Sequence, residues 1–157
     1  MEISILFLPF IASIISGFFG KYIGDRNSEI VTSALVSISA LLSIFVLYQV
    51  IVNQYEENIV IATWINSGSL DVNWSMLIDP LSAVMLVVVT SVSSLVHIYS
   101  IGYMSHDPHK PRFMAYLSLF TFAMLMLVTS DNFIQLFFGW EGVGLCSYFL
   151  IGFWFKK

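Results

Sequence analysis

Charged side chains are scarce in this sequence. Only 10% of its 157 residues are Asp, Glu, Lys or Arg, whereas a soluble domain carries about 25%. The hydrophobic share of 58% excludes intrinsic disorder, because a disordered chain has few apolar residues. The 6 basic residues stand against 10 acidic ones, which leaves no polybasic patch and excludes nucleic acid as an expected partner. These shortages indicate an integral membrane protein in contact with the lipid bilayer.

The residues that usually hold cofactors and metals are also missing. A single cysteine, Cys146, excludes a disulfide framework and a cysteine-based zinc cluster. There is no glycine-rich nucleotide loop, no Ser-His-Asp arrangement and no haem or iron–sulfur motif. His106 and His109 flank Asp107, but two histidines and one aspartate in a proline-containing loop are weak evidence for a metal site. We interpret this segment as a solvated loop and expect no cofactor or metal on this chain.

Long apolar stretches are what the sequence has in abundance. A helix crosses the hydrocarbon core with about 20 mostly apolar residues. Five stretches qualify, and they predict transmembrane helices over residues 3–20, 30–52, 80–101, 113–129 and 133–155. Pro80 and Pro111 suit the first turn of a helix. The predicted fold class is an all-α membrane protein, with residues 1–157 forming one membrane domain.

The first stretch could also be read as a signal peptide. A secretory signal has a basic start and a cleavage site of small residues. This stretch has Glu2 at its start, no basic residue there and no convincing cleavage site. We therefore expect it to remain as a transmembrane helix.

One connection between the predicted spans is long, over residues 53–79. Within it, two segments rich in Ile, Val and Trp flank Asn66-Ser67-Gly68-Ser69, a sequence with turn chemistry. This pattern predicts a short external β-hairpin between the second and third helices. Trp64 and Trp74 suit the membrane–water interface over which the hairpin would lie.

The distribution of basic residues predicts the orientation. With five spans, every Lys and Arg falls on one side, at Lys21, Arg26, Lys110, Arg112, Lys156 and Lys157. Cytoplasmic loops are enriched in Lys and Arg, so the amino terminus is expected outside and the carboxyl end inside. The charged residues on the other side are all acidic, namely Glu2, Glu56, Glu57, Asp71 and Asp131.

Glu141 is the one carboxylate well inside a predicted span. A charge there is costly, and such residues usually face protein or water and often take part in proton relays. Burial without a nearby cation favours the neutral acid. The alternative is a protonated acid that makes one structural hydrogen bond. We favour the functional interpretation, with Glu141 as a proton-carrying carboxylate.

Two spans carry stripes of small or polar residues that predict close helix packing. The stripes are Gln135, Gly139, Gly142 and Cys146 in the fifth span, and Ser13, Gly17, Gly20 and Gly24 in the first. Phe137, Gly144 and Tyr148 share the other face of the fifth span with Glu141, at 100° per residue. This span is therefore expected to pack on at least two sides.

The third span has one polar face, formed by Asp79, Thr90, Ser93, Ser94 and His97. A polar face in lipid must contact protein or water. His97 is the one histidine within a predicted span, and imidazole is suited to proton transfer near neutral pH. We consider two roles for it, a proton relay and a structural hydrogen bond to a backbone carbonyl.

Four sequence runs resemble a known family. They lie at 79–82, 96–104, 112–116 and 131–148, and the last contains Gly-Trp-Glu-Gly at 139–142. Together they resemble the amino-terminal part of the chain L (chain 5) membrane subunit of proton-translocating NADH:quinone oxidoreductase, respiratory complex I. Large subunits of multisubunit sodium/proton antiporters and of membrane-bound hydrogenases share much of this pattern.

The resemblance implies a role in coupling electron transfer to proton translocation. It implies that Glu141 works with a lysine on a later helix and that His97 is an accessory proton relay. It also implies that other membrane subunits are the partners, and that NADH, FMN, iron–sulfur clusters and quinone are bound by partner subunits. The expected location is the bacterial plasma membrane or the mitochondrial inner membrane.

Members of this family are several times longer, and the partner lysine would lie beyond residue 157. The chain is thus expected to be the amino-terminal piece of a longer antiporter-like subunit, not competent to pump alone. The alternatives are a sodium/proton antiporter or hydrogenase subunit, and a non-catalytic fragment or assembly module.

Overall fold

The computed structural model describes residues 1–68 and 70–154. Its elements are α1 (Glu2–Ile23), α2 (Asp25–Asn53), β1 (Glu57–Ser67), β2 (Leu70–Ile78), α3 (Pro80–Tyr103), α4 (Lys110–Val128) and α5 (Phe133–Ile151). All five helices are long and apolar enough to cross a membrane. The predicted fold class, five transmembrane helices with a β-hairpin between the second and third, is confirmed.

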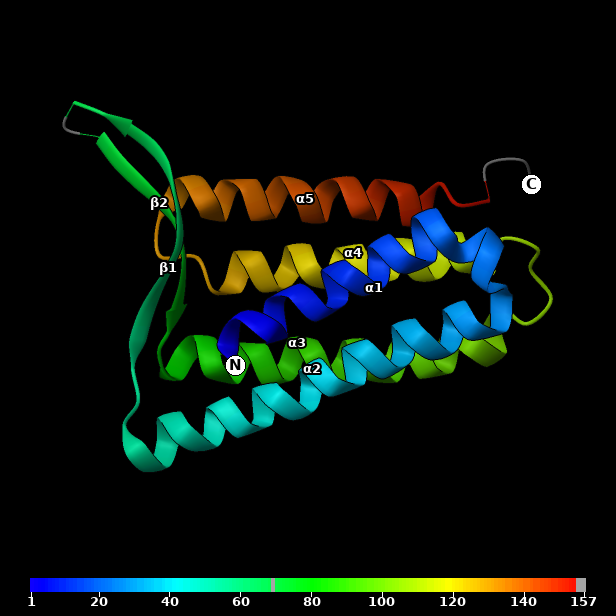
Figure 1. Ribbon diagram of the computed structural model, residues 1–157, viewed down its shortest axis with the longest axis horizontal. Helices are drawn as coiled ribbons and strands as arrows, with labels where there is room; N and C mark the ends of the chain where they lie inside the picture. The colour runs from blue at the N-terminus through cyan, green and yellow to red at the C-terminus, as the bar shows by residue number, and fades with distance from the viewer. Residues whose placement is uncertain (69, 155–157) are drawn as a thin grey trace.

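The five helices lie roughly side by side and form one bundle (Figure 1). Helix α4 packs against α1, α2, α3 and α5, whereas, within the part of the chain that the structure describes, α5 packs closely on α4 alone. The α1–α2 turn and the α3–α4 loop lie at one end of the bundle, hereafter the loop end, and the hairpin lies at the other (Figure 1). Helix α5 therefore stands at the edge of the bundle with much of its surface uncovered.

Helix α2 begins at Asp25, five residues before the predicted start of the second span at residue 30. Only Gly24 separates it from α1, and this glycine has a φ of 86°, a conformation that glycine adopts without steric cost. The tight turn places Asp25 in the first turn of α2, where its charge is stabilised by the helix dipole. Polar residues that the sequence suggested to be a loop thus belong to the helix.

The small residues of α1 pack against the start of α4. A Cβ atom on Gly20 would lie 2.6 Å from the Cβ atom of Pro111, and one on Gly17 would lie 3.5 Å from that of Ala115. The hydroxyl group of Ser16 donates a hydrogen bond to the carbonyl oxygen of Pro111 at 2.7 Å. The small-residue stripe predicted for the first span is in this way a helix-packing surface.

The hairpin is antiparallel, with Ile59 opposite Met76 and Asn66 opposite Asp71. It crosses the end of the bundle (Figure 1) and is attached there by the side chain of Gln135. The Gln135 side chain accepts from the backbone nitrogen of Ser75 at 3.0 Å and donates to the carbonyl oxygen of Ser75 at 2.7 Å. These two hydrogen bonds join β2 to the first turn of α5.

The start of α3 is defined by a capping box. Asp79 Oδ1 accepts from the backbone nitrogen of Ser82 at 2.6 Å, and Ser82 Oγ accepts from the backbone nitrogen of Asp79 at 2.8 Å. Pro80 occupies the first turn, where it costs no helical hydrogen bond. Asp79, which the sequence grouped with the polar face of the third span, serves as the helix cap.

Candidate functional site

Hydroxyl groups connect α3 to α2 in the interior of the bundle. The hydroxyl groups of Ser37 and Ser94 lie 2.8 Å apart, and those of Ser43 and Thr90 lie 2.7 Å apart. Ser43 and Thr90 are fully buried. Burying a hydroxyl group without a hydrogen bond costs free energy. In each pair, the hydrogen bond between the two hydroxyl groups replaces the hydrogen bonds to water that they lose on burial. Two of the five residues of the polar face predicted for the third span, Thr90 and Ser94, are thus directed at α2.

Two further residues of this polar face, Ser93 and His97, are directed at α4, and His97 is 0% exposed. Its Nδ1 lies 2.7 Å from the carbonyl oxygen of Ser93, and its Nε2 lies 3.0 Å from the Oγ atom of Ser118. A carbonyl oxygen only accepts hydrogen bonds, so Nδ1 carries a proton and donates it. Nε2 accepts from the Ser118 hydroxyl group when the ring is neutral.

The partners of His97 suit both of its charge states. If Nε2 gains a proton, it donates to the Ser118 oxygen, because a hydroxyl group both donates and accepts. The Nδ1 hydrogen bond to Ser93 is unchanged. Next to the ring, the hydroxyl groups of Ser93 and Thr121 lie 2.5 Å apart. The α3–α4 contact can therefore hold a histidine that gains and loses a proton without losing a hydrogen bond.

Glu29 is a buried carboxylate that the sequence analysis missed. It is 5% exposed, and its Oε1 lies 4.0 Å from the Nζ atom of Lys110 on α4. Among the described residues, Oε1 has no hydrogen-bond partner, and neither has the buried hydroxyl group of Ser33 one turn further along α2. The predicted second span begins at Ile30 and so leaves Glu29 outside, whereas α2 begins at Asp25. The spacing of Glu29 by four residues from Ser33, and by eight from Ser37, was the available signal.

These groups form a column of polar side chains that runs from the loop end to Ser94, three residues before His97 in α3. Glu29, Ser33 and Ser37 follow one face of α2 and rise by about 12 Å, at 1.5 Å per residue. The column continues to Ser94 on α3 through the hydrogen bond to Ser37. Buried polar atoms without protein partners usually bind water. The column is thus a candidate site for bound water between α2 and α3, and no hydrogen bond of the described residues joins it to His97.

The small-residue stripe of α5 packs on α4. A Cβ atom on Gly139 would lie 2.9 Å from the backbone nitrogen of Leu127, and one on Gly142 would lie 3.1 Å from the Cβ atom of Ala123. Cys146, on the same stripe, is 2% exposed. The fit requires glycine at residue 139, because any larger side chain would meet backbone atoms.

Glu141 lies on the opposite, exposed face of α5. Its neighbours on this face, Phe137 and Tyr148, are 62% and 72% exposed, and a Cβ atom on Gly144 would meet nothing within 4 Å. A carboxylate in this position is too costly to leave against lipid. This face is therefore expected to contact further protein or water in the membrane.

The described residues do not bring Glu141 and His97 together. His97 is enclosed between α3 and α4, whereas Glu141 lies on the α5 face that no described helix covers. No hydrogen bond in the described part of the chain connects the two side chains.

The α3–α4 loop does not form a metal site with the described residues. No group of three His, Cys, Asp or Glu side chains is placed there, or elsewhere in residues 1–68 and 70–154, to hold a metal ion. The carboxylate of Asp107 instead accepts hydrogen bonds from the backbone nitrogen of His109 at 2.8 Å and from the Nε1 atom of Trp154 at 2.7 Å. Asp107 thus orders the loop and joins it to the chain after α5.

The fold defines a class, the helical integral membrane proteins with ionisable residues inside their transmembrane segments. Within it, residues 64–114 match the family model described as NADH-ubiquinone oxidoreductase (complex I), chain 5 N-terminus. Residues 130–157 match the model described as NADH:quinone oxidoreductase/Mrp antiporter, TM.

Three similar proteins are named NADH-ubiquinone oxidoreductase chain 5. The protein of Phytophthora infestans is 54% identical over 155 residues, which is 99% of this chain and 23% of that protein. The protein of Arabidopsis thaliana is 55% identical over 157 residues, which is 100% of this chain and 24% of that protein. The protein of Dictyostelium discoideum is 47% identical over the same length.

This chain belongs to the NADH-ubiquinone oxidoreductase chain 5 family and matches its amino-terminal part. The resemblance found in the sequence runs is thereby confirmed. The chain spans 23% to 24% of the length of these relatives.

Proposed function

We propose that the chain is part of a membrane subunit of a proton-translocating NADH:quinone oxidoreductase. The observation that carries the proposal is the match of the entire chain to chain 5 proteins at about 50% identity. In this proposal NADH, FMN, iron–sulfur clusters and quinone are bound by partner subunits. This chain supplies transmembrane helices and groups that take up and release protons.

Glu141 is the proposed proton-carrying carboxylate. Its exposed face on α5 leaves room for a cationic side chain of the remaining protein. The approach of a cation favours the ionised carboxylate and hence release of the proton, and withdrawal of the cation favours its recapture. Glu141 would thus alternate between its two charge states as the cation moves.

His97 is the proposed accessory proton relay. This role is supported by the hydrogen-bond partners of both ring nitrogens, because the Ser93 carbonyl oxygen and the Ser118 hydroxyl group suit the neutral and the charged ring alike. The column from Glu29 to Ser94 would supply protons from the loop end through bound water. Each transfer would move a proton from water to Nε2, or from Nε2 back to water, by way of the Ser118 hydroxyl group.

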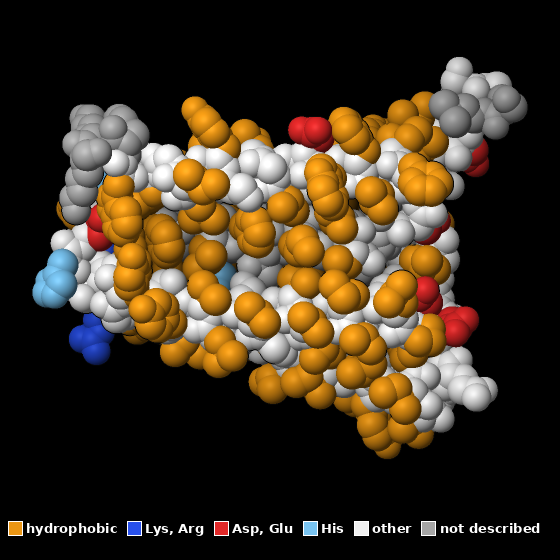
Figure 2. Space-filling view, turned by 180° about the vertical axis from the view of Figure 1, so that it is seen from behind, with side chains coloured by type: hydrophobic (Ala, Val, Ile, Leu, Met, Phe, Trp, Pro, Cys, Tyr) orange, Lys and Arg blue, Asp and Glu red, His pale blue; other side chains and the backbone are white. Residues whose placement is uncertain are grey.

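The proposed orientation puts the loop end in the cytoplasm or the mitochondrial matrix. Lys21, Arg26, Lys110 and Arg112 belong to the helix turns at this end. In Figure 2, basic and histidine side chains project at the loop end and acidic ones gather at the hairpin end. Lys156 and Lys157, which also entered the prediction, lie outside the described residues. Positively charged loops favour the inner side of the membrane.

The test is the Glu141→Gln variant in the complete subunit, with Glu56→Gln on the exposed hairpin side as the control. Removing one essential proton-carrying group should reduce proton pumping at least about tenfold, within the range of losses seen for acid–base groups. Native gels stained for NADH dehydrogenase activity should show both variants in a large active complex. Unchanged proton pumping by Glu141→Gln would contradict the proposal. A subunit that carries an affinity tag and migrates on the native gel only at low mass would contradict it as well.

A second candidate function is cation/proton antiport. It is favoured by the match of residues 130–157 to a family model whose description includes the Mrp antiporter. An antiporter would use the same carboxylate without NADH or quinone. Transport that depends on an added sodium gradient, and that persists without NADH, would support this candidate over the first.

A further inference from the structure

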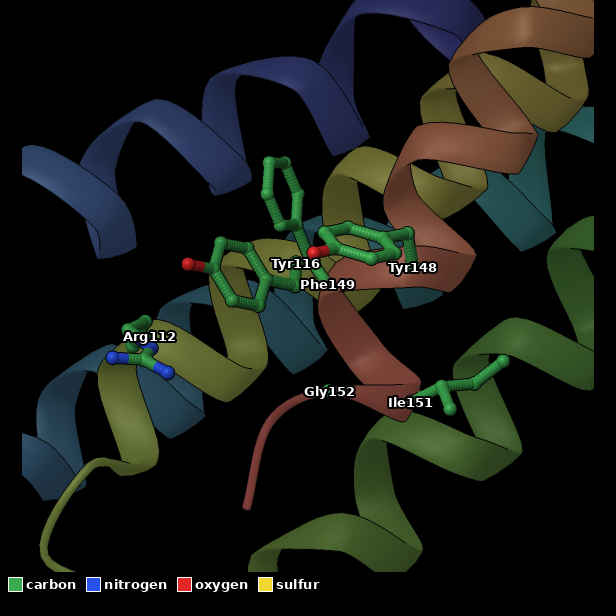
Figure 3. A pocket seen from close by; sticks show the side chains of 6 residues that line it. All are labelled: Arg112, Tyr116, Tyr148, Phe149, Ile151 and Gly152. Atoms are coloured by element: carbon green, nitrogen blue, oxygen red, sulfur yellow. The ribbon is translucent and has the colours of Figure 1, made fainter. Parts of the chain in front are cut away.

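The loop end of the bundle contains two features with polar side chains. The first is the pocket between the start of α4 and the end of α5 (Figure 3). Its wall includes Tyr148, which belongs to the Glu141 face and is expected to contact further protein. The second is the ion pair of Glu29 and Lys110, between α2 and α4. Because described helices enclose Glu29, this carboxylate is buried by the bundle itself.

The two groups of the ion pair are close together but do not form a hydrogen bond. Oε1 of Glu29 lies 4.0 Å from Nζ of Lys110, whereas a hydrogen bond between nitrogen and oxygen spans about 2.7–3.2 Å. The side chain of Glu29 is 7% exposed and that of Lys110 is 20% exposed. Polar groups at this separation are commonly bridged by water. Lys110 therefore connects the buried carboxylate to water at the loop end.

Two buried oxygen atoms on this face of α2 have no hydrogen-bond partner among the described residues, Oε1 of Glu29 and Oγ of Ser33. Ser33 lies one helical turn after Glu29. An ionised carboxylate only accepts hydrogen bonds, whereas a protonated carboxyl group also donates one. A hydroxyl group both donates and accepts. The Ser33 hydroxyl group can therefore serve Glu29 in either charge state, through a bound water molecule.

Opposing influences act on the charge of Glu29. Among the described residues, two charged groups act on it from the surrounding elements. The positive charge of Lys110 on α4 favours the ionised carboxylate, whereas burial and the negative charge of Asp25, one turn earlier on α2, favour the neutral acid. A buried ion pair offsets its desolvation cost only when hydrogen bonds satisfy its remaining atoms, which Oε1 lacks. A carboxyl group in such surroundings is suited to exchange its proton.

We infer that Glu29 is a second proton-binding carboxylate of this chain, which takes up protons from the loop end with Lys110 as its cationic partner. A hydronium ion at the loop end gives its proton to Oε1 and becomes water. The carboxylate then becomes a neutral acid, while Lys110 keeps its charge and its contact with water. Transfer of the proton to water at Ser33 restores the ion pair. This inference rests on the proposed function, because proton translocation is the reaction that the uptake serves.

The experiment reads the protonation state of Glu29 by infrared spectroscopy, with the complete subunit in its membrane assembly. A protonated carboxyl group and a carboxylate absorb at different frequencies. Spectra of the unaltered protein and of Glu29→Gln are compared over a series of pH values. We expect a carboxylic acid band that grows on acidification and is missing from Glu29→Gln. Glu56→Gln, which removes an exposed carboxylate at the hairpin end, should keep this band.

Lys110 variants test the cationic partner and also control for misfolding. Loss of a nearby cation favours the neutral acid, so Lys110→Gln should move the titration of the Glu29 band to higher pH, by about 1–3 pH units. Lys110→Arg keeps the charge and should leave the titration close to that of the unaltered protein. A structural defect common to all variants would not produce opposite changes in Glu29→Gln and Lys110→Gln.

Proton pumping provides the second readout. Glu29→Gln should lower the number of protons pumped for each NADH oxidised at least about tenfold, as loss of an acid–base group does, while Glu56→Gln should leave it unchanged. Unchanged pumping by Glu29→Gln would overturn the assignment of proton uptake to this residue.

Two spectroscopic results would also overturn the inference. Spectra without a Glu29 acid band at any pH would mean that the carboxylate stays ionised and only joins α2 to α4. A titration unaffected by Lys110→Gln would mean that Lys110 is not its partner. The infrared measurement needs neither NADH nor turnover, so it tests Glu29 separately from the proposed function.

Discussion

Single residues of this chain differ in how completely their hydrogen bonds are satisfied. His97 has a partner on each ring nitrogen, whereas Glu29 has a buried oxygen without one among the described residues. Buried polar atoms without partners cost free energy unless water binds them. We therefore expect ordered water near Glu29, and a firmly held ring at His97.

The hydroxyl group of Ser118 is expected to support His97 directly. Ser118→Ala removes the partner of Nε2 and leaves a buried ring nitrogen without a hydrogen bond, at a cost of about 1–3 kcal/mol. The thermal midpoint of the subunit should fall, and proton pumping should fall with it if His97 relays protons. Ser105→Ala, in the exposed loop after α3, is the control and should change neither quantity.

Asp131, in the connection between α4 and α5, is expected to make hairpin attachment sensitive to acid. Burial raises its pKa, but hydrogen bonds from the side chains of Asn58 at 2.7 Å and Asn132 at 2.8 Å favour the ionised carboxylate, and the pKa lies below its ordinary value of 3.8. The ionised carboxylate is thus favoured in the folded protein. The contribution of Asp131 to the stability of the hairpin attachment is complete above pH 3.8. This contribution is lost as the pH falls through the lowered pKa.

Hydrogen exchange of the hairpin amides should therefore accelerate when the pH is lowered below 3.8, after correction for the intrinsic rate. Asp131→Asn should show faster exchange already at neutral pH and little further change on acidification. Asp71→Asn, at the hairpin tip, should behave like the unaltered protein. A pH response of Asp131→Asn equal to that of the unaltered protein would show that another group is responsible.

At the scale of single elements, the close approach of α5 to α4 depends on small residues. The sequence pattern identified the stripe on α5, because small residues recurring every three to four positions mark one helix face. It did not identify the neighbour. That neighbour is α4, and Gly139 contacts its backbone at Leu127.

Gly139→Ala is expected to push α5 away from α4. The added Cβ atom would lie 2.9 Å from two backbone atoms of Leu127, which cannot move as a side chain can. Overpacking of this kind costs about 1–3 kcal/mol, so the unfolding midpoint in detergent should fall. The matched control is Gly102→Ala in α3, where nothing lies within 4 Å; an equal loss in both variants would exclude the steric explanation.

At the scale of the whole molecule, the two ends of the bundle differ in charge and structure. The hairpin closes one end and is joined to α5 through Gln135, while tight connections with basic residues lie at the other (Figure 1). This asymmetry supports the proposed orientation. It also means that one reagent added from one side of the membrane can distinguish the two ends.

Cysteine labelling in intact cells should report this orientation. Asp71→Cys at the hairpin tip is expected to react with an impermeant thiol reagent added outside. His106→Cys, in the α3–α4 loop, should react only after the membrane is permeabilised. The native Cys146 is 2% exposed and should react in neither case, so it serves as the internal control. The reverse pattern would show that the amino terminus faces inward.

The sequence predicted the number of spans and the hairpin correctly because both depend on local properties. A transmembrane helix requires only length and apolar side chains, and a hairpin requires β-branched segments around a turn. The start of α2 was predicted too late, at residue 30, because polar residues in its first turns lower local hydropathy. In the structure these residues are helical, and Glu29 among them is buried.

The sequence by itself determined the fold class, the family and the presence of ionisable groups inside the membrane, because hydropathy, turn chemistry and motif runs are properties of neighbouring residues. The tertiary structure decided which side of each helix is covered. It enclosed His97 and Glu29 between helices and left Glu141 on the uncovered side of α5. The physical reason is that burial of a helix face depends on which distant segment packs against it, and the helical period alone does not specify that segment.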